Sequence, residues 1–266
     1  LNQNRTEWIS KDLKTSKESK VLYFTGCLPY FDVFFSDIGV NTLEIAKSTV
    51  KLLNAIGIIP MVHPQERCCG HDLFWSGDME NFERLANQNA RLIRESGAEL
   101  IVTSCAECYR TLKVDYPKYI GTLGVEVKHI TQILQELGDD LTFKNSESKV
   151  TFQDPCRLGR HMGVYDEPRK LISKIPGVSF VEMVKNREKA VCCGTSAWMS
   201  CNQVSRTIQK NRLSDAKSTG AEVLLTACPK CYIHLTCTQL DSSISKDETV
   251  KIEDVTVLAA SNLYKK

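Results

Sequence analysis

Short apolar runs alternate along the chain with longer segments of helical periodicity. The run VLYFT (21–25) is typical of a strand, and residues 42–57 place apolar side chains at helical spacing. Residues 81–97 repeat the helical spacing, and ELIVTS (99–104) is a further strand candidate that leads into a helix from about residue 105. Strands that alternate with helices favour parallel pairing, so we predict an α/β fold.

The second half of the chain repeats the first. VLYFTGCLPY (21–30) corresponds to VTFQDPCRLG (150–159), and residues 89–112, which end in CAECYRTL, correspond to residues 212–235, which end in CPKCYIHL. Two copies of such a unit indicate a pair of lobes rather than a solenoid. We therefore predict two pseudo-symmetric, Rossmann-like lobes, each a small parallel sheet with flanking helices.

The repeat also sets the expected domain boundaries. The polar, lysine-rich residues 1–20 are predicted to form an N-terminal linker or arm, followed by a first lobe over 21–148 and a second lobe over 149–266. Within the lobes, IIPMV (58–62) and EVLLTA (222–227) are further strand candidates.

Composition narrows the class of protein. The chain has 266 residues, 42% of them apolar, and a net charge of +2, which gives no reason to expect nucleic acid as a partner. Its longest apolar run, AIGIIPMV (55–62), is too short to span a bilayer, so no transmembrane segment is expected. No export signal is visible, and we expect a cytoplasmic protein, the cytoplasmic face of a membrane complex included.

Twelve cysteines are many for such a chain, and in a reducing compartment they favour metal or redox chemistry over disulfides. Ten of them form one pattern twice: a single cysteine, an adjacent pair, and a CxxC pair where a helix is predicted to begin. The first set is Cys27, Cys68, Cys69, Cys105 and Cys108, and the second set is Cys156, Cys192, Cys193, Cys228 and Cys231.

Five cysteines per lobe exceed the four ligands of a structural zinc site. Adjacent cysteines cannot easily direct both thiolates at one small ion, whereas neighbouring sulfurs can bind different irons of a cluster. Gly70 and Gly194 follow the adjacent pairs and would let the backbone approach an inorganic core. Iron–sulfur clusters are therefore favoured, with a structural zinc protein or thioredoxin-like chemistry as alternatives.

The pattern C-x40-CCG-x34-CxxC, repeated as C-x35-CCG-x33-CxxC, resembles the cysteine-rich CCG domain of heterodisulfide reductase subunits of the B and D types. The resemblance covers about residues 1–260. It implies that each set holds a noncubane [4Fe–4S] cluster, that the two clusters face each other, and that a disulfide is reduced between them. The residues to which it gives a catalytic role are the adjacent pairs, Cys68, Cys69, Cys192 and Cys193.

His71 directly follows the first CCG motif and is the best candidate for a proton donor. The cations beside the cysteines could moderate the cluster charge and attract a small anionic disulfide, although ordinary surface charges are the alternative. These cations are Arg110, Arg157, Arg160, His161 and Lys230.

Four further residues near the motifs have simpler expected roles. Cys201 and Cys237 lie outside both sets and are expected to pack as small apolar side chains, with packing beside the second cluster as the alternative. Trp75 and Trp198 follow the CCG motifs and could shield clusters from water, but ordinary core packing explains them equally well.

The resemblance also implies partners. NRTEW (4–8) is similar to the linker that follows a ferredoxin-like module in D-type fusions, so we expect such a module upstream or on a partner chain, with a flavoprotein as electron donor. The expected function is disulfide reduction within a larger electron-transfer complex. The alternative is an electron-transfer module that links a flavoprotein to a quinone or protein thiol without substrate chemistry of its own.

Overall fold

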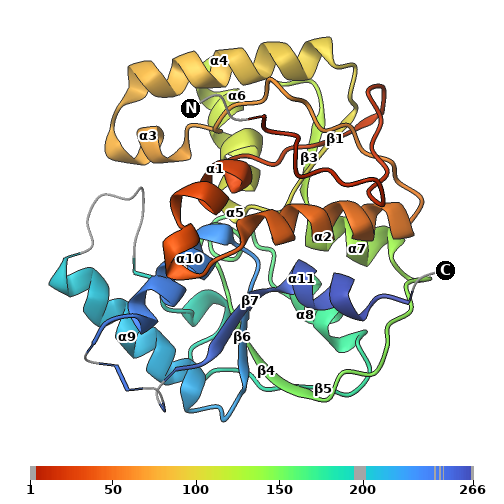
Figure 1. The fold of residues 1–266 in the computed structure, drawn as a ribbon. Coiled ribbons are helices and arrows are strands. Elements are labelled where there is room, and N and C mark those ends of the chain that lie inside the picture. The colour runs from red at the N-terminus through yellow and green to blue at the C-terminus, as the bar shows by residue number, and fades with distance from the viewer. Residues whose placement is uncertain (1–3, 195–201, 243, 246, 248, 265–266) are drawn as a thin grey trace.

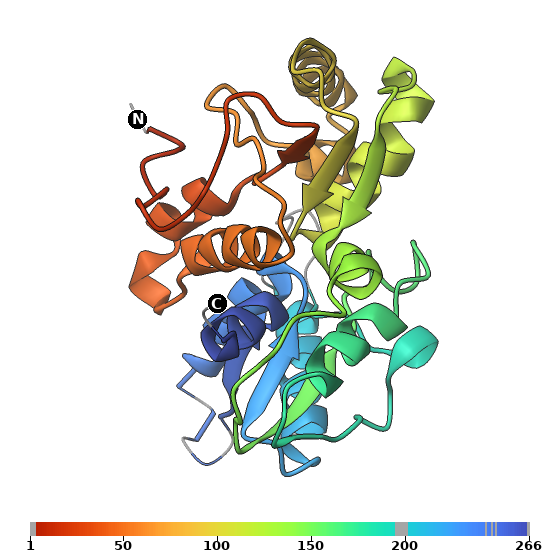
Figure 2. The same ribbon diagram turned by 90° about the vertical axis from the view of Figure 1, so that its right-hand side faces the viewer.

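The computed structural model describes residues 4–194, 202–242, 244–245, 247 and 249–264, and Figure 1 shows their arrangement. The α/β prediction is confirmed, because the chain forms two parallel sheets with flanking helices. Figures 1 and 2 show the two sheets one above the other, with helices α2 and α11 between them.

The first lobe has three parallel strands in the order β1-β2-β3, and Leu100 of the central strand lies opposite Val21 and Glu126. Its strands are β1 (Val21–Tyr23), β2 (Leu100–Thr103) and β3 (Glu126–His129). Its helices are α1 (Leu28–Phe34), η1 (Ser36–Ile38), α2 (Thr42–Ala55), α3 (His71–Ser76), α4 (Met79–Glu95), α5 (Ala106–Arg110), η2 (Thr111–Asp115), α6 (Tyr116–Ile120) and α7 (Ile130–Leu137).

The second lobe has four parallel strands in the order β5-β4-β6-β7, and Val150 of β4 pairs with both Phe180 and Val223. Its strands are β4 (Ser148–Gln153), β5 (Val178–Phe180), β6 (Val223–Thr226) and β7 (Lys251–Asp254). Its helices are α8 (Asp166–Ser173), η3 (Arg187–Lys189), α9 (Gln203–Lys217), α10 (Pro229–Gln239) and α11 (Val255–Asn262).

The long helices begin at side-chain caps that the periodicity alone could not fix. The side chain of Asn41 accepts a hydrogen bond from the backbone N–H of Glu44 and begins α2, and Asp78 caps α4 in the same way. In the second lobe Asn202 accepts from the N–H of Ser205 and begins α9. Each helix therefore starts where a side chain satisfies one of its first free N–H groups.

The expected strand over 58–62 is wrong in extent, because only Met61 pairs with β1. The Met61 N–H donates to the Val21 carbonyl over 2.8 Å, and the Tyr23 N–H donates to the Met61 carbonyl over the same distance. Pro60 has no N–H to add to the ladder. The first lobe therefore has one bridging residue where the second lobe has the strand β5 beside β4.

The lobes pack together with pseudo-two-fold symmetry. Helix α2 of the first lobe packs against α11 of the second, and α8 of the second lobe packs against α7 of the first. Helices α2 and α8 both follow the first strand of their lobe, and α7 and α11 both follow the last. One hydrophobic core joins buried residues of both lobes, among them Phe82 and Phe152. The division at residues 148 and 149 stays a prediction.

The N-terminal arm lies against the first lobe. Trp8 and Leu13 are buried and pack with Tyr23, Ile45 and Val50. The indole N–H of Trp8 donates to the Arg5 carbonyl over 2.8 Å. Among the helices of the described ranges, none is long and apolar enough to cross a membrane.

Replacing Trp8 with alanine tests the docking of the arm. Trp8 is 8% exposed, so Trp8→Ala should lower the free energy of unfolding by about 3 kcal/mol and open the arm to protease. Denaturant unfolding and limited proteolysis of anaerobically prepared protein would measure both effects. Val204→Ala, at a position 68% exposed, is the control and should change stability by less than about 0.5 kcal/mol. A Trp8→Ala variant as stable as the control would contradict the docking.

Candidate functional site

The strand ends bring the ten cysteines of the repeated pattern together. Cys27 follows β1 and is the N-cap of α1, and Cys105 follows β2 and is the N-cap of α5. In the second lobe Cys156 follows β4, and Cys228 follows β6 and is the N-cap of α10. Because the carboxyl ends of parallel strands share one edge of a sheet, each lobe gathers its cysteines at that edge.

The thiols of the two sets contact one another in the same order. In the first set the order is Cys27, Cys68, Cys69, Cys108 and Cys105, with 3.5 Å between the sulfurs of Cys69 and Cys108. In the second set the order is Cys156, Cys192, Cys193, Cys231 and Cys228. The repeat in the sequence is thus a repeat in three dimensions.

The first cysteine of each adjacent pair is the one most easily ionised. Hydrogen bonds from Cys27 and Cys69 hold the pKa of Cys68 well below its usual range. Hydrogen bonds from Cys156 and Cys193 lower the pKa of Cys192 to about 2. Thiolates are the form that binds metal, so each set has a preferred first ligand at the same place.

Gly26, which no motif in the sequence singled out, lies against the sulfurs. It has φ +61°, and a Cβ atom there would lie 2.7 Å from Cys108 Sγ. The expected role of Gly70 and Gly194 is different in the structure. A Cβ on Gly70 would meet the Phe82 ring at 2.9 Å, and one on Gly194 would meet Gln209. These two glycines admit neighbouring side chains, and Gly26 admits the sulfur.

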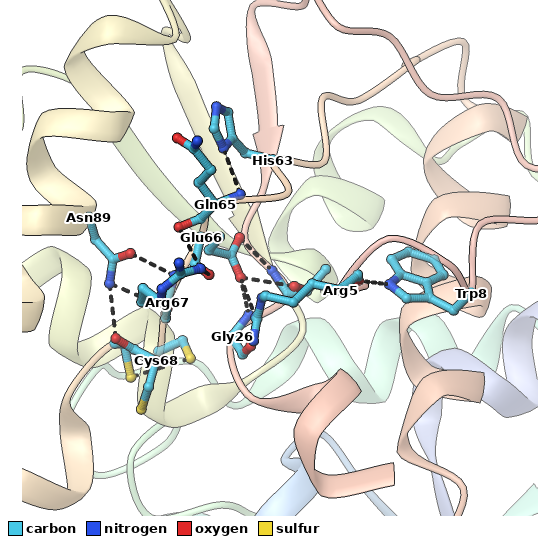
Figure 3. A network of polar contacts seen from close by, with 12 residues as sticks. Arg5, Trp8, Gly26, His63, Gln65, Glu66, Arg67, Cys68 and Asn89 are labelled. Carbon is cyan, nitrogen blue, oxygen red and sulfur yellow. Dashed lines mark hydrogen bonds and ion pairs between the residues drawn. The ribbon is translucent and has the colours of Figure 1, made fainter. Parts of the chain in front are cut away.

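A buried carboxylate joins the two cysteine loops of the first lobe. Glu66 is 1% exposed and accepts hydrogen bonds from the Gly26 N–H over 2.7 Å and from the Thr25 hydroxyl over 2.8 Å. Arg5 of the N-terminal arm lies 3.4 Å from the same carboxylate. Figure 3 shows Glu66 between the arm and the loop that carries Cys68. Burial raises the pKa of Glu66 to about 7, although Arg5, Thr25 and Gly26 oppose the shift.

Asn89 fixes the backbone of the adjacent cysteines from helix α4. Its side-chain amide donates to the Cys68 carbonyl over 2.9 Å, and its carbonyl oxygen accepts from the Arg67 N–H over 2.9 Å. The Tyr116 hydroxyl donates to the Cys69 carbonyl over 3.0 Å. Sequence reasoning missed Asn89, although a polar residue on the buried face of a helix was a signal that could have found it.

The second lobe holds its loops with other residues. The Gln153 side chain donates to the Val191 carbonyl over 3.1 Å, and Arg212 donates to the Gln153 side chain. Arg212 is fully buried and stands at the position that Asn89 has in the first lobe, 123 residues earlier. Arg160 donates to the Ala190 carbonyl over 2.6 Å. The sulfur arrangement is therefore repeated, whereas its supports are not.

The two cysteine pockets adjoin each other. Both are lined by Glu107, from between the cysteines of the first CxxC pair, and by Lys230, from between those of the second. Lys230 Nζ lies 3.2 Å from Glu107 Oε2 and also contacts Asp72. His71 Nε2 lies 3.1 Å from Glu107 Oε1. The first set thus faces the second set across a buried network of charges.

This network keeps its charges at neutral pH. Burial alone would raise the pKa of Glu107, but His71 and Lys230 outweigh it and hold the value well below the usual range. Burial alone would lower the pKa of Lys230, but Glu107 and Asp72 raise it above the usual range. His71, Asp72 and Glu107 have ligand atoms within 4.8 Å of one another. Lys230 contacts both carboxylates, so we interpret this group as an ion-pair network rather than a metal site.

Three of the predicted cations line the second pocket, whose volume is about 210 Å³. They are Arg157, Arg160 and His161, and Lys230 lines it from the other side. The Arg157 guanidinium lies 3.7 Å from the ring centroid of Trp75, so Trp75 packs toward this pocket from the first lobe. Arg110 pairs with Asp115, lies 5.2 Å from the same ring, and does not line either cysteine pocket.

The remaining expectations have mixed outcomes. Cys237 is exposed on α10, so the expectation that it packs as a buried apolar side chain is wrong. A side chain on the solvent face of a helix cannot serve the core. Trp198 and Cys201 lie outside the described residues.

A family model described as a cysteine-rich domain, CCG, matches residues 21–113 and again residues 150–236. The chain belongs to the CCG cysteine-rich domain family. The predicted resemblance is thereby confirmed. Each match covers one set of five cysteines, from the strand that precedes the first cysteine to the helix that follows the CxxC pair.

Curated relatives match most of the chain. The D-type subunit of the dihydromethanophenazine:CoB–CoM heterodisulfide reductase of Methanosarcina acetivorans is 36% identical over 98% of this chain and 63% of its own length. The B-type subunit of a fumarate reductase (CoM/CoB) from Methanothermobacter marburgensis is 33% identical over 82% of this chain and 42% of its own. The EtfAB:quinone oxidoreductase of Syntrophomonas wolfei is 32% identical over 81% and 30%.

The chain therefore spans less than two thirds of the length of these relatives. Among solved structures, a putative Asp/Glu racemase from Yersinia pestis aligns over 91% of this chain and 96% of its own, with 15% identity and a TM-score of 0.36. That likeness is too distant to bear on the site.

The donor set of each CCG domain fits an iron–sulfur cluster. Five thiols converge, Gly26 leaves the room beside Cys108 that a Cβ would fill, and the metal-binding thiolate form is favoured at Cys68. Cysteine sulfurs are the ligands that such clusters use.

Replacing Gly26 with alanine tests this fit. The new methyl group would contact Cys108 Sγ, so Gly26→Ala should lose about half of the bound iron, namely that of the first set. Gly39→Ala is a matched control, because Gly39 also has positive φ, +77°, but has nothing within 4 Å of a Cβ. It should lose about 1 kcal/mol of stability and keep its iron. Equal iron content in the two variants would contradict the close approach at Gly26.

Proposed function

We propose that this chain is the iron–sulfur part of an oxidoreductase and reduces a disulfide substrate where its two lobes meet. The observation that carries the proposal is the pair of complete five-cysteine sets whose pockets share Glu107 and Lys230. Reduction of a disulfide takes two electrons, and two one-electron sites beside one common space suit that requirement. The similarity to a D-type heterodisulfide reductase chain supports the choice of substrate class.

The cofactors that we propose are two [4Fe–4S] clusters of the noncubane type. When bound, they would supply the substrate with one electron each. The ligands of one cluster would be Cys27, Cys68, Cys69, Cys105 and Cys108, and those of the other Cys156, Cys192, Cys193, Cys228 and Cys231. The adjacent pairs Cys68–Cys69 and Cys192–Cys193 stand at the centre of each sulfur order, which supports a catalytic role for them.

The second pocket is the proposed entrance for an anionic disulfide. Arg157, Arg160 and Lys230 surround it with positive charge. Burial and the neighbouring arginines lower the pKa of His161 to about 4, so this imidazole is neutral near pH 7 and acts as a hydrogen-bonding group. The arginines would hold an anionic arm of the substrate and orient its sulfur atoms toward the cysteines.

His71 remains the proposed proton donor. It is 1% exposed, and its two ring nitrogens face Thr111 over 3.3 Å and Glu107 over 3.1 Å. Glu107 lines both cysteine pockets, so the His71–Glu107 contact is the proposed path along which a proton would reach the departing thiolate.

A second candidate function is electron transfer without substrate chemistry, between a flavoprotein and a quinone or protein thiol. Its support is the buried ion pair of Glu107 and Lys230, which occupies the space between the two sets. The similarity to an EtfAB:quinone oxidoreductase points the same way. We favour disulfide reduction because the second pocket retains about 210 Å³ lined by cations.

The proposed partners follow from the same relatives, which are longer than this chain. We propose a ferredoxin-like iron–sulfur module, on the same polypeptide or on a partner chain, and a flavoprotein electron donor. The proposed location is the cytoplasm, including the cytoplasmic face of a membrane complex.

Metal content and substrate response test the proposal together. Anaerobically purified protein should contain about eight iron atoms and about eight acid-labile sulfides per chain. Addition of a small anionic disulfide to the reduced protein should reoxidise the clusters and change their EPR signals. Full iron content without such a response would favour the electron-transfer module, and zinc in place of iron would overturn both candidates.

The substrate entrance has its own test. Arg160→Gln should raise the KM for an anionic disulfide about tenfold and leave kcat nearly unchanged, since it removes charge and no cysteine. A neutral disulfide is the control and should show little change. Loss of discrimination between the two disulfides in the native protein would argue against this entrance.

A further inference from the structure

Glu107 and Lys230 occupy the same position of the repeat with opposite charge. Each is the residue just before the second cysteine of its CxxC pair, and the two are related by the offset of 123 residues that relates Cys105 to Cys228. Two equivalent positions near a pseudo-two-fold axis must approach each other, so like charges would repel there. Opposite charges let the two CxxC pairs come together.

The pair is among the most enclosed ion pairs of the described residues. Glu107 is 7% exposed and Lys230 is 3% exposed, and their charged atoms lie 3.2 Å apart. Asp72 and His71 complete the surroundings with an acceptor for Lys230 and a donor for Glu107. An ion pair buried in this way is costly to break, because the remaining charge has no water to solvate it.

Each charge acts on the cysteine set of the other lobe. After the hydrogen bonds from Cys27 and Cys69, the Lys230 ammonium is one of the groups that hold the pKa of Cys68 low. The hydrogen bond with Cys231 lowers the pKa of Cys228, but burial and then the Glu107 carboxylate raise it. The positive charge of the second lobe therefore faces the first set, and the negative charge of the first lobe faces the second set.

We propose that Glu107 and Lys230 are a positioning pair that aligns the two CxxC motifs and shifts the reduction potentials of the two sites in opposite directions. This inference rests on the proposed function, because it requires a cluster in each set. A positive charge stabilises the extra electron of a reduced cluster, and a negative charge destabilises it. Lys230 thus raises the potential of the first site, and Glu107 lowers the potential of the second.

Such a difference would give the electrons a direction. The crossed pair makes the first site the better electron acceptor of the two, compared with a chain that has no charge at these positions. Arg157 and Arg160 act on the second site in addition, so the pair contributes one part of the total difference. The inference concerns that part, which substitution of the pair isolates.

Single substitutions measure each half of the pair. The full-length protein, purified anaerobically, would be titrated with dithionite while both cluster signals are followed by EPR, and a Cys27→Ser variant would assign the signal of the first site. Glu107→Gln should raise the potential of the second site, and Lys230→Met should lower that of the first. Both variants should also melt at lower temperature, since each leaves a buried charge without its partner.

A charge exchange keeps the pair and reverses its direction. Glu107→Lys combined with Lys230→Glu would be made together with Asp72→Asn, which removes a carboxylate beside position 230, and would be compared with Asp72→Asn alone. The melting temperature and the iron content should match those of this reference. The potential of the first site should fall, and that of the second should rise.

The half-exposed pair of Lys128 and Glu136, 2.6 Å apart, provides the control. Its exchange should leave both potentials unchanged, since solvent screens these charges. Cluster potentials that stay in place, or move in the same direction, in the exchanged Glu107–Lys230 variant would overturn the inference. So would an exchanged variant that loses its fold or its iron, because the pair is present there. Native protein without two clusters would instead overturn the proposed function itself.

Discussion

Five sulfur atoms have to reach one small volume in each lobe, and the chain supplies them from three separate loops. Parallel strands solve most of this problem, because they deliver the single cysteine and the CxxC pair to the same sheet edge. The adjacent pair comes from a loop without a strand, so it needs other support. In the first lobe Asn89 and Glu66 hold that loop through its backbone and its neighbour.

The two lobes meet this requirement with different residues. The sulfurs touch in one order in both, yet Asn89 of the first lobe stands where the second has the buried Arg212. Glu66 has alanine as its counterpart in the second lobe, where Arg160 and Gln153 bind the loop backbone instead. The ligand positions are fixed by the cluster that they fit, whereas any group that satisfies a buried carbonyl or N–H can support a loop.

The lobe interface makes one site out of two copies. The crossed packing of α2 with α11 and of α7 with α8 sets the sheets in register and turns their cysteine edges toward each other. At that junction the chain buries charge, in the contacts of Lys230 with Glu107 and Asp72. Burial in surroundings of low dielectric constant makes such charges act strongly on nearby sulfurs, so the junction is also where the two sites can be made unequal.

The sequence by itself determined the α/β class, the tandem repeat and the ten cysteines, because strand and helix periodicities and the CCG and CxxC spacings are local patterns. It also placed Lys230, Arg157 and Arg160 near the cysteines, since they are neighbours along the chain. Only the tertiary structure decided which groups meet across long separations, such as Glu107 with Lys230, Gly26 with Cys108, and Arg5 with Glu66. Those contacts depend on the packing of one lobe on the other and of the arm on the first lobe, and no periodicity in the sequence records such packing.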